Sequence, residues 1–312
     1  MHETHEDVYL PVILLQFSCC HSVVWFTGEG RPSRVHRVAR LRLSEDEIYI
    51  RGVTLLGNRI YVVCLMSNVI TVFTSHRPFP HLQDIVVDGL CSPVDVAACV
   101  NAGCLYVADP GSRSVWRISV DSGAVVQWLT DMGASTVSVT SEDSVVLLVL
   151  VDVPLHVDKV CRDEVHVYSP EAMREAVINL SPDINPQSVV MTTRKTLIVS
   201  HDDRWDGEMD RVCEVDMTGR VLKSFGSTRG SGNGQLYSPA GVSLDDEERV
   251  IVADTGKNRV LLLNKQLTSA RVLMTWQSDD DASEPWSLHY DSHTGSLLVG
   301  LSSGHVDIYK LK

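Results

Sequence analysis

Four glycines within ten residues make the segment GSTRGSGNGQ, from Gly226 to Gln235, the first candidate for chemistry in this sequence. Glycine-rich loops can wrap a phosphate, because their backbone N–H groups approach an anion without steric hindrance. Such a site also needs a Lys followed by Ser or Thr, and a helix that begins directly after the loop. Neither is present here, since the loop leads into Tyr-Ser-Pro and an apolar run. The sequence therefore argues against a nucleotide site.

Acidic residues and histidines suggest two metal sites, and neither is complete. The segment DDRWDGEMDRVC begins like a calcium loop, but Arg204 stands at a ligand position and Cys213 at the twelfth, where such a loop carries Glu. A zinc ion would need converging histidines, for which His156, His201 and His289 are the candidates. The sequence has no C-x-x-C pair and no G-x-S-x-G elbow. We therefore predict no catalytic residue, no bound metal and no cofactor.

Strands, rather than helices, must position any site in this chain. Helical periodicity is nearly absent, and only SPEAMREAVINL (169–180) is mildly helical. Apolar runs of one kind recur roughly every 40 to 55 residues, a spacing typical of propeller blades. These runs are RIYVVCL, CLYVADP, VVLLVLV, TLIVSHD, RVIVADT and SLLVGLS. Because a second strand-like run follows each of them, the sequence predicts an all-β fold, a six-bladed β-propeller.

Two of the repeats match closely, SPVDVAACVNAGCLYVADPGSRSVWRI from Ser92 and SPAGVSLDDEERVIVADTGKNRVLLL from Ser238. In each, we expect the Pro to lead the chain into the inner strand, the Asp to accept backbone N–H bonds at the turn, and the Gly to take a positive φ. An Arg in the second copy can pair with its Asp across the turn, whereas Ser114 stands at that place in the first copy. The predicted structural residues are Pro93, Asp109, Gly111, Pro239, Asp254, Gly256 and Arg259.

The segment FGSTRGSGNGQLYSPAGVSLDDEERVIVADTGKNRVLLL resembles an NHL repeat. That unit runs F-G-x-x-G-x-G-x-G-Q-[FL]-x-x-P, then an apolar strand, then V-x-D-x-x-N-x-R-[IV]. The match covers about 40 residues, which is one unit of a propeller. The resemblance implies a six-bladed propeller related to the propeller end of tripartite-motif proteins. It also implies a protein-interaction module, with substrate recognition in the ubiquitin pathway, although this sequence carries no ring finger.

The last repeat lacks an outer strand, and the segment RVHRVARLRLS (34–44) can supply one. A strand from the N-terminal end that joins the last blade closes the ring and removes a sheet edge. We therefore expect residues 34–312 to form the propeller and residues 1–33 to be an N-terminal extension outside it.

Long loops on one face of this propeller are the predicted protein-binding surface. They span 151–163, 200–211, 226–236 and 277–286, and long irregular loops often carry function. The face is acidic, with Asp202 and Asp210 among its charges, so we expect a protein partner with a basic contact surface. Trp and Arg are favoured at interface hot spots. The candidate contacts are Trp205, Arg204, Asp206, Arg229, Trp286 and His156.

The overall charge narrows the classes of partner. With 27 Lys and Arg against 40 Asp and Glu, the net charge is −13, which disfavours nucleic acid and anionic membranes. The apolar N-terminal run is too short for a typical span and lacks the basic start of a signal peptide. We predict a non-catalytic scaffold that is a cytoplasmic monomer with reduced cysteines. Two alternatives stay open: a propeller hydrolase or lyase with a metal in its central channel, and an RNA-binding NHL domain.

Overall fold

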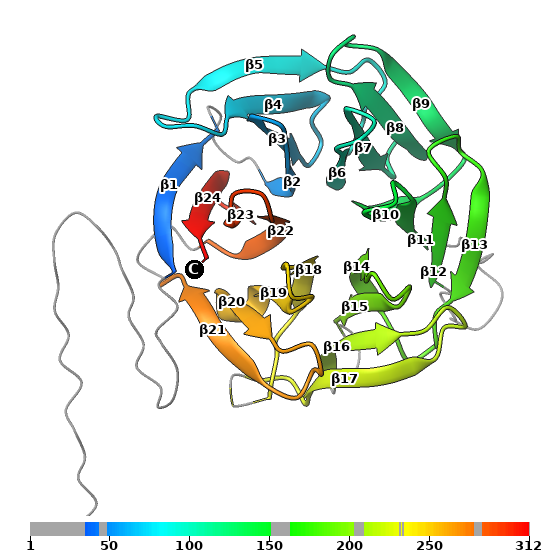
Figure 1. The fold of residues 1–312 in the computed structure, drawn as a ribbon, viewed down its shortest axis with the longest axis vertical. Coiled ribbons are helices and arrows are strands. Elements are labelled where there is room, and N and C mark those ends of the chain that lie inside the picture. The colour runs from blue at the N-terminus through cyan, green and yellow to red at the C-terminus, as the bar shows by residue number, and fades with distance from the viewer. Residues whose placement is uncertain are drawn as a thin grey trace, which may run out of the picture.

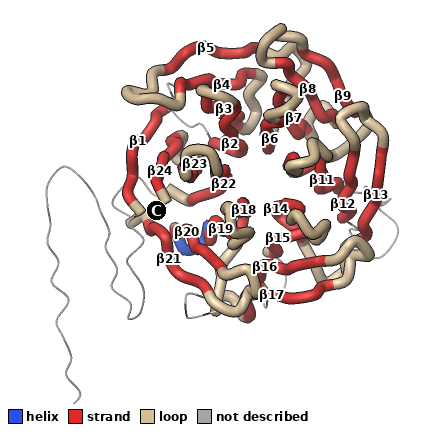
Figure 2. The backbone as a smooth tube through the Cα atoms, in the orientation of Figure 1, coloured by secondary structure: helices blue, strands red, loops and turns tan. Residues whose placement is uncertain are grey.

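Six four-stranded antiparallel sheets stand around a central axis in the computed structural model (Figure 1). The structure describes residues 35–43, 49–150, 163–202, 209–230, 232, 234–277 and 283–311. Almost all regular structure in these residues is β, and one 3-10 helix, η1 (Thr255–Lys257), interrupts it (Figure 2). The predicted all-β, six-bladed propeller is therefore confirmed.

Each blade runs from an inner strand beside the central axis to an outer strand at the rim. Blade 1 contains β2 (Ile50–Leu56), β3 (Arg59–Cys64), β4 (Val69–Thr74) and β5 (His81–Val86). Blade 2 contains β6 (Asp95–Cys99), β7 (Cys104–Asp109), β8 (Ser114–Ser119) and β9 (Val125–Thr130). Blade 3 contains β10 (Ala134–Val139), β11 (Val145–Leu150), β12 (Asp163–Tyr168) and β13 (Arg174–Asn179).

The second half of the ring repeats this order. Blade 4 contains β14 (Pro186–Met191), β15 (Leu197–His201), β16 (Asp210–Val215) and β17 (Val221–Ser227). Blade 5 contains β18 (Pro239–Leu244), β19 (Val250–Asp254), β20 (Arg259–Leu263) and β21 (Ala270–Thr275). Blade 6 contains β22 (Pro285–Asp291), β23 (Ser296–Leu301), β24 (His305–Lys310) and β1 (His36–Arg42).

The apolar runs of the sequence are the second strands of the blades, and they are buried because another blade covers each face. Every residue of β7, β15, β19 and β23 is buried. Six hydrophobic clusters result, one between each pair of neighbouring blades. The ring is thus stabilised by packing from blade to blade, which leaves the inner strands to line the axis.

Strand β1 closes the ring, as the sequence predicts, by pairing antiparallel with β24. An ion pair with a buried carboxylate reinforces this junction: the Arg40 guanidinium donates to both carboxylate oxygens of Asp307, at 2.7 and 2.9 Å. Trp276 Nε1 donates to the same carboxylate at 3.1 Å. The proposed extension 1–33 lies outside the described residues, so the domain boundaries remain predictions.

One expectation about secondary structure is wrong. The mildly helical segment 169–180 contains a turn followed by the outer strand β13, which pairs with β12 from Glu164↔Asn179 to Tyr168↔Arg174. Pairing with the edge of blade 3 overrides a weak local helical preference. The described residues contain no helix that is long and apolar enough to cross a membrane. No disulfide joins the cysteines among them, and Cys91 is the exposed one of the five.

Candidate functional site

One residue position recurs near the start of every inner strand, directly before a buried Val or, in blade 6, a partly buried Leu. We call it the ring position. It is occupied by Gly52, Asp95, Thr136, Ser188, Gly241 and Ser287. The inner strands that carry it follow one another around the axis, and each contacts the inner strands of both neighbouring blades. The ring position therefore lies at the junction between adjacent blades.

At two of the six junctions, the side chain at the ring position bonds the backbone of the next inner strand. At the junction of blades 6 and 1, Ser287 Oγ accepts a hydrogen bond from Val53 N at 3.0 Å. At the junction of blades 2 and 3, Asp95 Oδ2 accepts from Val137 N at 3.0 Å, and Asp95 Oδ1 accepts from Val96 N at 2.9 Å. A backbone donor at the exposed edge of an inner strand thus gains an acceptor from its neighbour.

Glycine at the ring position lets two backbones approach each other directly. A Cβ on Gly52 would lie 2.7 Å from Val96 N, and a Cβ on Gly241 would lie 2.6 Å from Trp286 O. Among the six ring positions, therefore, five hold a glycine or a hydroxyl, and one holds a carboxylate.

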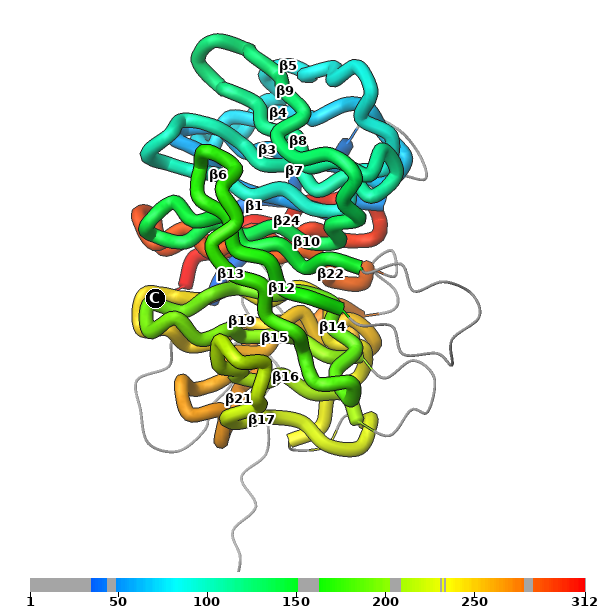
Figure 3. Tube along the Cα trace, turned by 90° about the vertical axis from the view of Figure 1, so that its right-hand side faces the viewer, coloured from blue at the N-terminus to red at the C-terminus, as the bar shows by residue number. Residues whose placement is uncertain are grey.

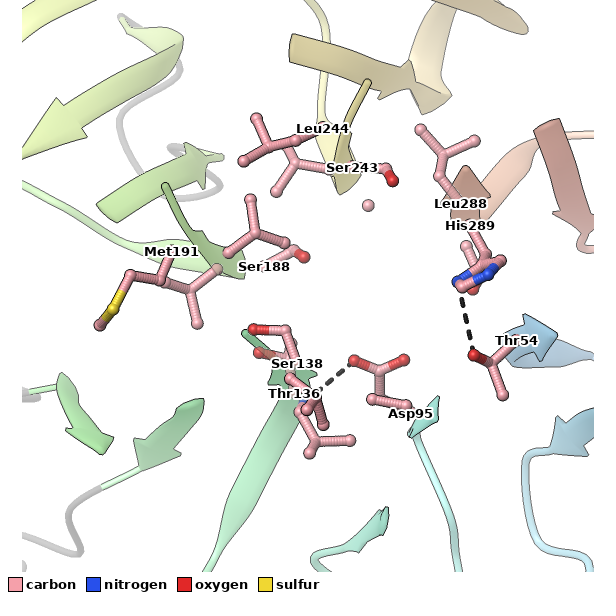
Figure 4. Close-up of a pocket in the computed structure, with 18 of the residues that line it drawn as sticks. Thr54, Asp95, Thr136, Ser138, Ser188, Met191, Ser243, Leu244, Leu288 and His289 are labelled. Atoms are coloured by element: carbon pink, nitrogen blue, oxygen red, sulfur yellow. Dashed lines mark hydrogen bonds between the residues drawn. The ribbon is translucent and has the colours of Figure 1, made fainter. Parts of the chain in front are cut away.

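The inner strands enclose a central channel of about 800 Å³, which is within the size range of small-molecule sites. Figure 4 shows its wall, where the labelled residues bear hydroxyl groups or are apolar apart from Asp95 and His289. His289 Nδ1 lies 3.4 Å from Thr54 Oγ1 on the arc of the wall next to Asp95. One acid and one imidazole thus share a channel that is otherwise uncharged along its middle.

The pKa values of Asp95 and His289 are shifted in opposite directions. Burial raises the pKa of Asp95 to about 7, although the N–H groups of Val137 and Val96 lower it in part. Burial lowers the pKa of His289 to about 4, against a smaller opposing effect of Asp291. At neutral pH the carboxyl is close to its midpoint and the imidazole is neutral. A carboxyl in this state can accept or donate a proton, which is a property of catalytic acids and bases.

Strand β10, beside Asp95, carries polar atoms that are not satisfied. Thr136 Oγ1 and Ser138 Oγ are enclosed and have no hydrogen-bond partner among the described residues. A buried hydroxyl of this kind costs about 1 to 3 kcal/mol. This arc of the channel wall is therefore not optimised for stability, as is common where a protein binds or reacts.

The two mouths of the channel differ in their chemistry. At the mouth where the inner strands begin, the Arg51 guanidinium lies 4.4 Å above the ring of Trp286. At the other mouth, Lys195 pairs with Glu142, and Tyr290 Oη donates to Asp246 at 2.9 Å. Trp286 was predicted to lie in an external loop, and it lies instead in β22 and lines the channel.

The other predicted protein contacts are only partly visible. His156, Arg204, Trp205 and Asp206 lie outside the described residues. Arg229 is described, and its guanidinium bonds Asp210 at 3.0 Å and Asp202 at 3.3 Å and lies 4.7 Å from the Tyr237 ring. Both carboxylates are buried, although the sequence placed them among the charges of an open face. Binding of a protein partner remains a prediction that none of these observations tests.

The glycine loop is folded around the side chain of Gln235. Its Oε1 accepts from Gly232 N at 2.9 Å, and its Nε2 donates to Thr228 Oγ1 at 3.2 Å. A Cβ on Gly230 would lie only 2.3 Å from Gln235 Oε1. The glycines thus make room for an amide within the chain, and the loop leads into β18 rather than into a helix.

The aspartates predicted to hold the repeats are fully buried and bind the segment that enters the blade. Asp254 accepts from Tyr237 N at 2.7 Å and from Arg259 Nε at 2.5 Å, so the predicted pair forms. Asp109 accepts from the backbone N–H groups of Cys91 and Ser92, each at 2.8 Å, and from Ser112 Oγ at 2.6 Å. The bonds reach back to the residues before Pro93 and Pro239.

The expectation that Gly111 and Gly256 take a positive φ is wrong. In these two turns the positive φ belongs to Arg113 at 53° and Asn258 at 49°. The glycines are needed for space instead: a Cβ on Gly111 would lie 2.8 Å from Ser92 Cβ, and one on Gly256 would lie 2.7 Å from Tyr237 Cγ.

Comparison with known proteins identifies the fold and no closer family. No protein-family model matches the chain, and no curated protein matches it either. A catalytically inactive His-to-Ala variant of virginiamycin B lyase from Staphylococcus aureus, with quinupristin, is 10% identical, with a TM-score of 0.60 over 88% of this chain and 99% of that one. A gluconolactonase candidate is 13% identical, with a TM-score of 0.62 over 88% and 92%. Hydrazine synthase of Kuenenia stuttgartiensis is 13% identical, with a TM-score of 0.58 over 84% and 75%.

These neighbours contradict the prediction that the chain is not an enzyme. That prediction relied on missing catalytic motifs, whereas solved structures with this fold include a lyase and a gluconolactonase candidate. The physical reason lies in the architecture. A propeller assembles its channel from single residues on six inner strands, so a channel site leaves no local motif in the sequence.

The open alternative places a metal in the central channel. A gluconolactonase-type site needs acids and amides at the ends of the inner strands. The described part of the chain contains no group of three or more His, Cys, Asp or Glu side chains that could hold a metal ion. Asp95 and His289 are the two titratable side chains labelled in the channel wall (Figure 4).

Proposed function

We propose that this protein is a small-molecule hydrolase or lyase of the six-bladed propeller type, with its substrate in the central channel and Asp95 as the group that transfers a proton. The observation that carries this proposal is the carboxylate at one ring position, where Gly, Ser or Thr serves in the other five blades. Its raised pKa and its place in a channel of ligand size support the same conclusion.

The neighbouring groups define what Asp95 can do. Its two oxygens each accept one backbone N–H bond, which fixes the carboxyl while leaving it partly accessible from the channel. The ionised form accepts a proton from a substrate atom, and the protonated form returns it to a leaving group. His289 is neutral at pH 7, so it can offer a hydrogen bond without adding charge.

The proposal is tested by turnover in wild type and in Asp95→Ser. Serine occupies the same ring position in Ser188 and Ser287, so the variant keeps an acceptor for Val137 N. Substrates are aliphatic lactones, p-nitrophenyl esters and compounds with an activated β-leaving group. Loss of a general acid or base lowers the rate by about 10²- to 10⁴-fold. We expect that loss in Asp95→Ser, together with a wild-type pH–rate inflection near 7.

Asp88→Ser is the matched control, because it removes a carboxylate from an exposed turn outside the channel. This variant should retain wild-type turnover. Equal rates in wild type and Asp95→Ser, or no turnover of any of these substrates by the wild-type protein, would contradict the proposal.

The NHL resemblance becomes a narrower proposal about descent. We propose that residues 225–264 are an NHL-type unit, supported by the loop packed around Gln235 and by the Asp254–Arg259 pair. Each of these residues stands at a position that the repeat pattern specifies. The proposal concerns one repeat of this chain, and it leaves the channel chemistry unchanged.

A further inference from the structure

The charge of Asp95 has no role in the contact that Asp95 makes between blades. Val137 N needs an acceptor, and Asp95 provides one at 3.0 Å. At the equivalent junction, the uncharged hydroxyl of Ser287 accepts from Val53 N at the same distance. A carboxylate at this position therefore adds a negative charge that the ring does not require, and that charge needs another explanation.

No side chain of the described channel neutralises this charge. The cationic side chains that line the channel are Arg51 and Lys195, one at each mouth. Arg51 lies over the Trp286 ring, and Lys195 pairs with Glu142. An ionised Asp95 is thus half-buried without a counter-ion among the described side chains, which is an unfavourable state for a carboxylate.

The strands packed against β6 do not supply a counter-ion for Asp95 either. Strand β10 carries no titratable side chain. The titratable residues on the other three strands are Arg51 on β2, Arg59, Tyr61 and Cys64 on β3, and Cys104, Tyr106 and Asp109 on β7. The pKa of Asp95 is set by its burial and by two backbone N–H groups, and none of these side chains contributes to it.

We propose that the substrate carries a protonated amine, which the carboxylate of Asp95 binds in the channel. This inference rests on the proposed function, since it assigns a chemical class to the same site. The ionised carboxylate that holds the ammonium group is also the form that accepts a proton from the substrate. An ammonium group supplies the missing counter-ion and forms a charge-assisted hydrogen bond. The net charge of −13 favours the approach of a cation.

Binding of an amine has a defined pH dependence. The carboxyl must be ionised to hold an ammonium group, and its pKa without a ligand is about 7. At pH 5.5 most molecules carry a protonated Asp95, which must lose its proton before it can bind the amine. Affinity for an amine should therefore rise with pH up to about 8 and then level off, until the amine itself loses its proton.

Three probes of one shape and different charge test the proposal: cyclohexylamine, cyclohexanol and cyclohexanecarboxylate. Isothermal titration calorimetry measures each of them against the full-length protein at pH 5.5 and pH 8. We expect cyclohexylamine to bind at least tenfold more tightly than cyclohexanol at pH 8, with a smaller ratio at pH 5.5, and cyclohexanecarboxylate to bind most weakly. In Asp95→Ser the amine should bind no better than the alcohol, and in Asp88→Ser the wild-type ratio should remain.

Asp95→Asn provides a second variant if Asp95→Ser does not fold, because it keeps the shape and an acceptor oxygen. Equal binding of amine and alcohol by the wild type, a preference for the carboxylate, or no binding of any probe overturns the proposal. So does an amine preference that survives in both variants, because the cation would then bind elsewhere. A loss of turnover in Asp95→Ser without an amine preference would leave the proposed enzyme standing and remove only this substrate class.

Discussion

Blades 2 and 5 are the two most similar repeats of the sequence, and they lie opposite each other across the channel (Figure 1). Their shared residues do the same work in both. Asp109 and Asp254 bind the segment that enters the blade, and Gly111 and Gly256 let that segment pass close by. At the ring position the two blades differ, since blade 2 has Asp95 where blade 5 has a glycine.

This difference separates two kinds of residue in a repeat protein. Residues that recur in blades 2 and 5 satisfy a need that both blades share, such as binding the entering segment or letting it pass close by. Asp95 exceeds that need, because a hydroxyl at Ser287 or a hydrogen at Gly241 suffices at other junctions. The Asp95 carboxylate faces the channel. Comparing the repeats of this chain with one another therefore locates the candidate site without a homologous sequence.

The strongest way to test this separation is to remove the shared aspartates. Asp254→Ala leaves the partly buried Arg259 and Tyr237 N without their buried acceptor, and breaking a buried ion pair costs about 3 to 5 kcal/mol. Asp109→Ala leaves two N–H groups and one hydroxyl and involves no arginine, so we expect a smaller loss of about 2 to 4 kcal/mol. Urea unfolding measures both free energies.

Asp95→Ser is the reference for that pair, since it lies in the same blade as Asp109 and should not lower the free energy of unfolding. If Asp95→Ser proved as destabilising as Asp109→Ala, Asp95 would be a structural residue and the separation would be wrong.

Exchanging the ring residues of the two blades tests the comparison directly. Gly241→Asp places a Cβ 2.6 Å from Trp286 O, so the blades must shift, and overpacking of this kind costs about 1 to 3 kcal/mol. Asp95→Gly removes a side chain from a junction that has room for one, and should cost less. Thermal unfolding of the two variants shows which of them loses more stability. A tolerated Gly241→Asp would mean that the junctions are interchangeable and that Asp95 needs no special explanation.

Sequence patterns were sufficient for the architecture because the fold depends on local and periodic signals. The spacing of apolar runs predicts the blades, and the missing outer strand of the last repeat predicts that β1 pairs with β24. The turn glycines show the limit of this reasoning. Gly111 and Gly256 suggested a positive φ, whereas their actual constraint is a neighbour distant in sequence, which no local rule includes.

The candidate site was missed for a related reason. The predicted surface followed loop length and charge, while the channel is lined by residues of six inner strands that lie far apart in the sequence. Figure 1 shows these strands around the axis, and Figure 3 shows the ring of blades turned by 90°. One signal was available. The second residue after Pro93 is Asp, and the second residue after Pro239 is Gly, so the two best-matching repeats already differed at the position that faces the channel.

The smallest expected effect is a change of stability with pH that Asp95 alone causes. Its pKa is 3.8 in the unfolded chain and about 7 in the folded one. Below pH 3.8 both states hold the proton, and between 3.8 and 7 only the folded state does, so rising pH lowers the free energy of unfolding across that interval. Above pH 7 both states are ionised and the loss stays constant.

Asp95→Ser lacks this loss, so its melting temperature relative to wild type should increase from pH 4.5 to pH 8 and then level off. Each kcal/mol corresponds to about 2 to 4 °C in a protein of this size class, and partial contact with water in the channel reduces the effect to a few degrees. All other groups titrate alike in both proteins and cancel in the difference. If the difference in melting temperature between Asp95→Ser and wild type stays constant or decreases as the pH rises, the channel does not desolvate Asp95. The carboxylate would then not distinguish blade 2 from blade 5.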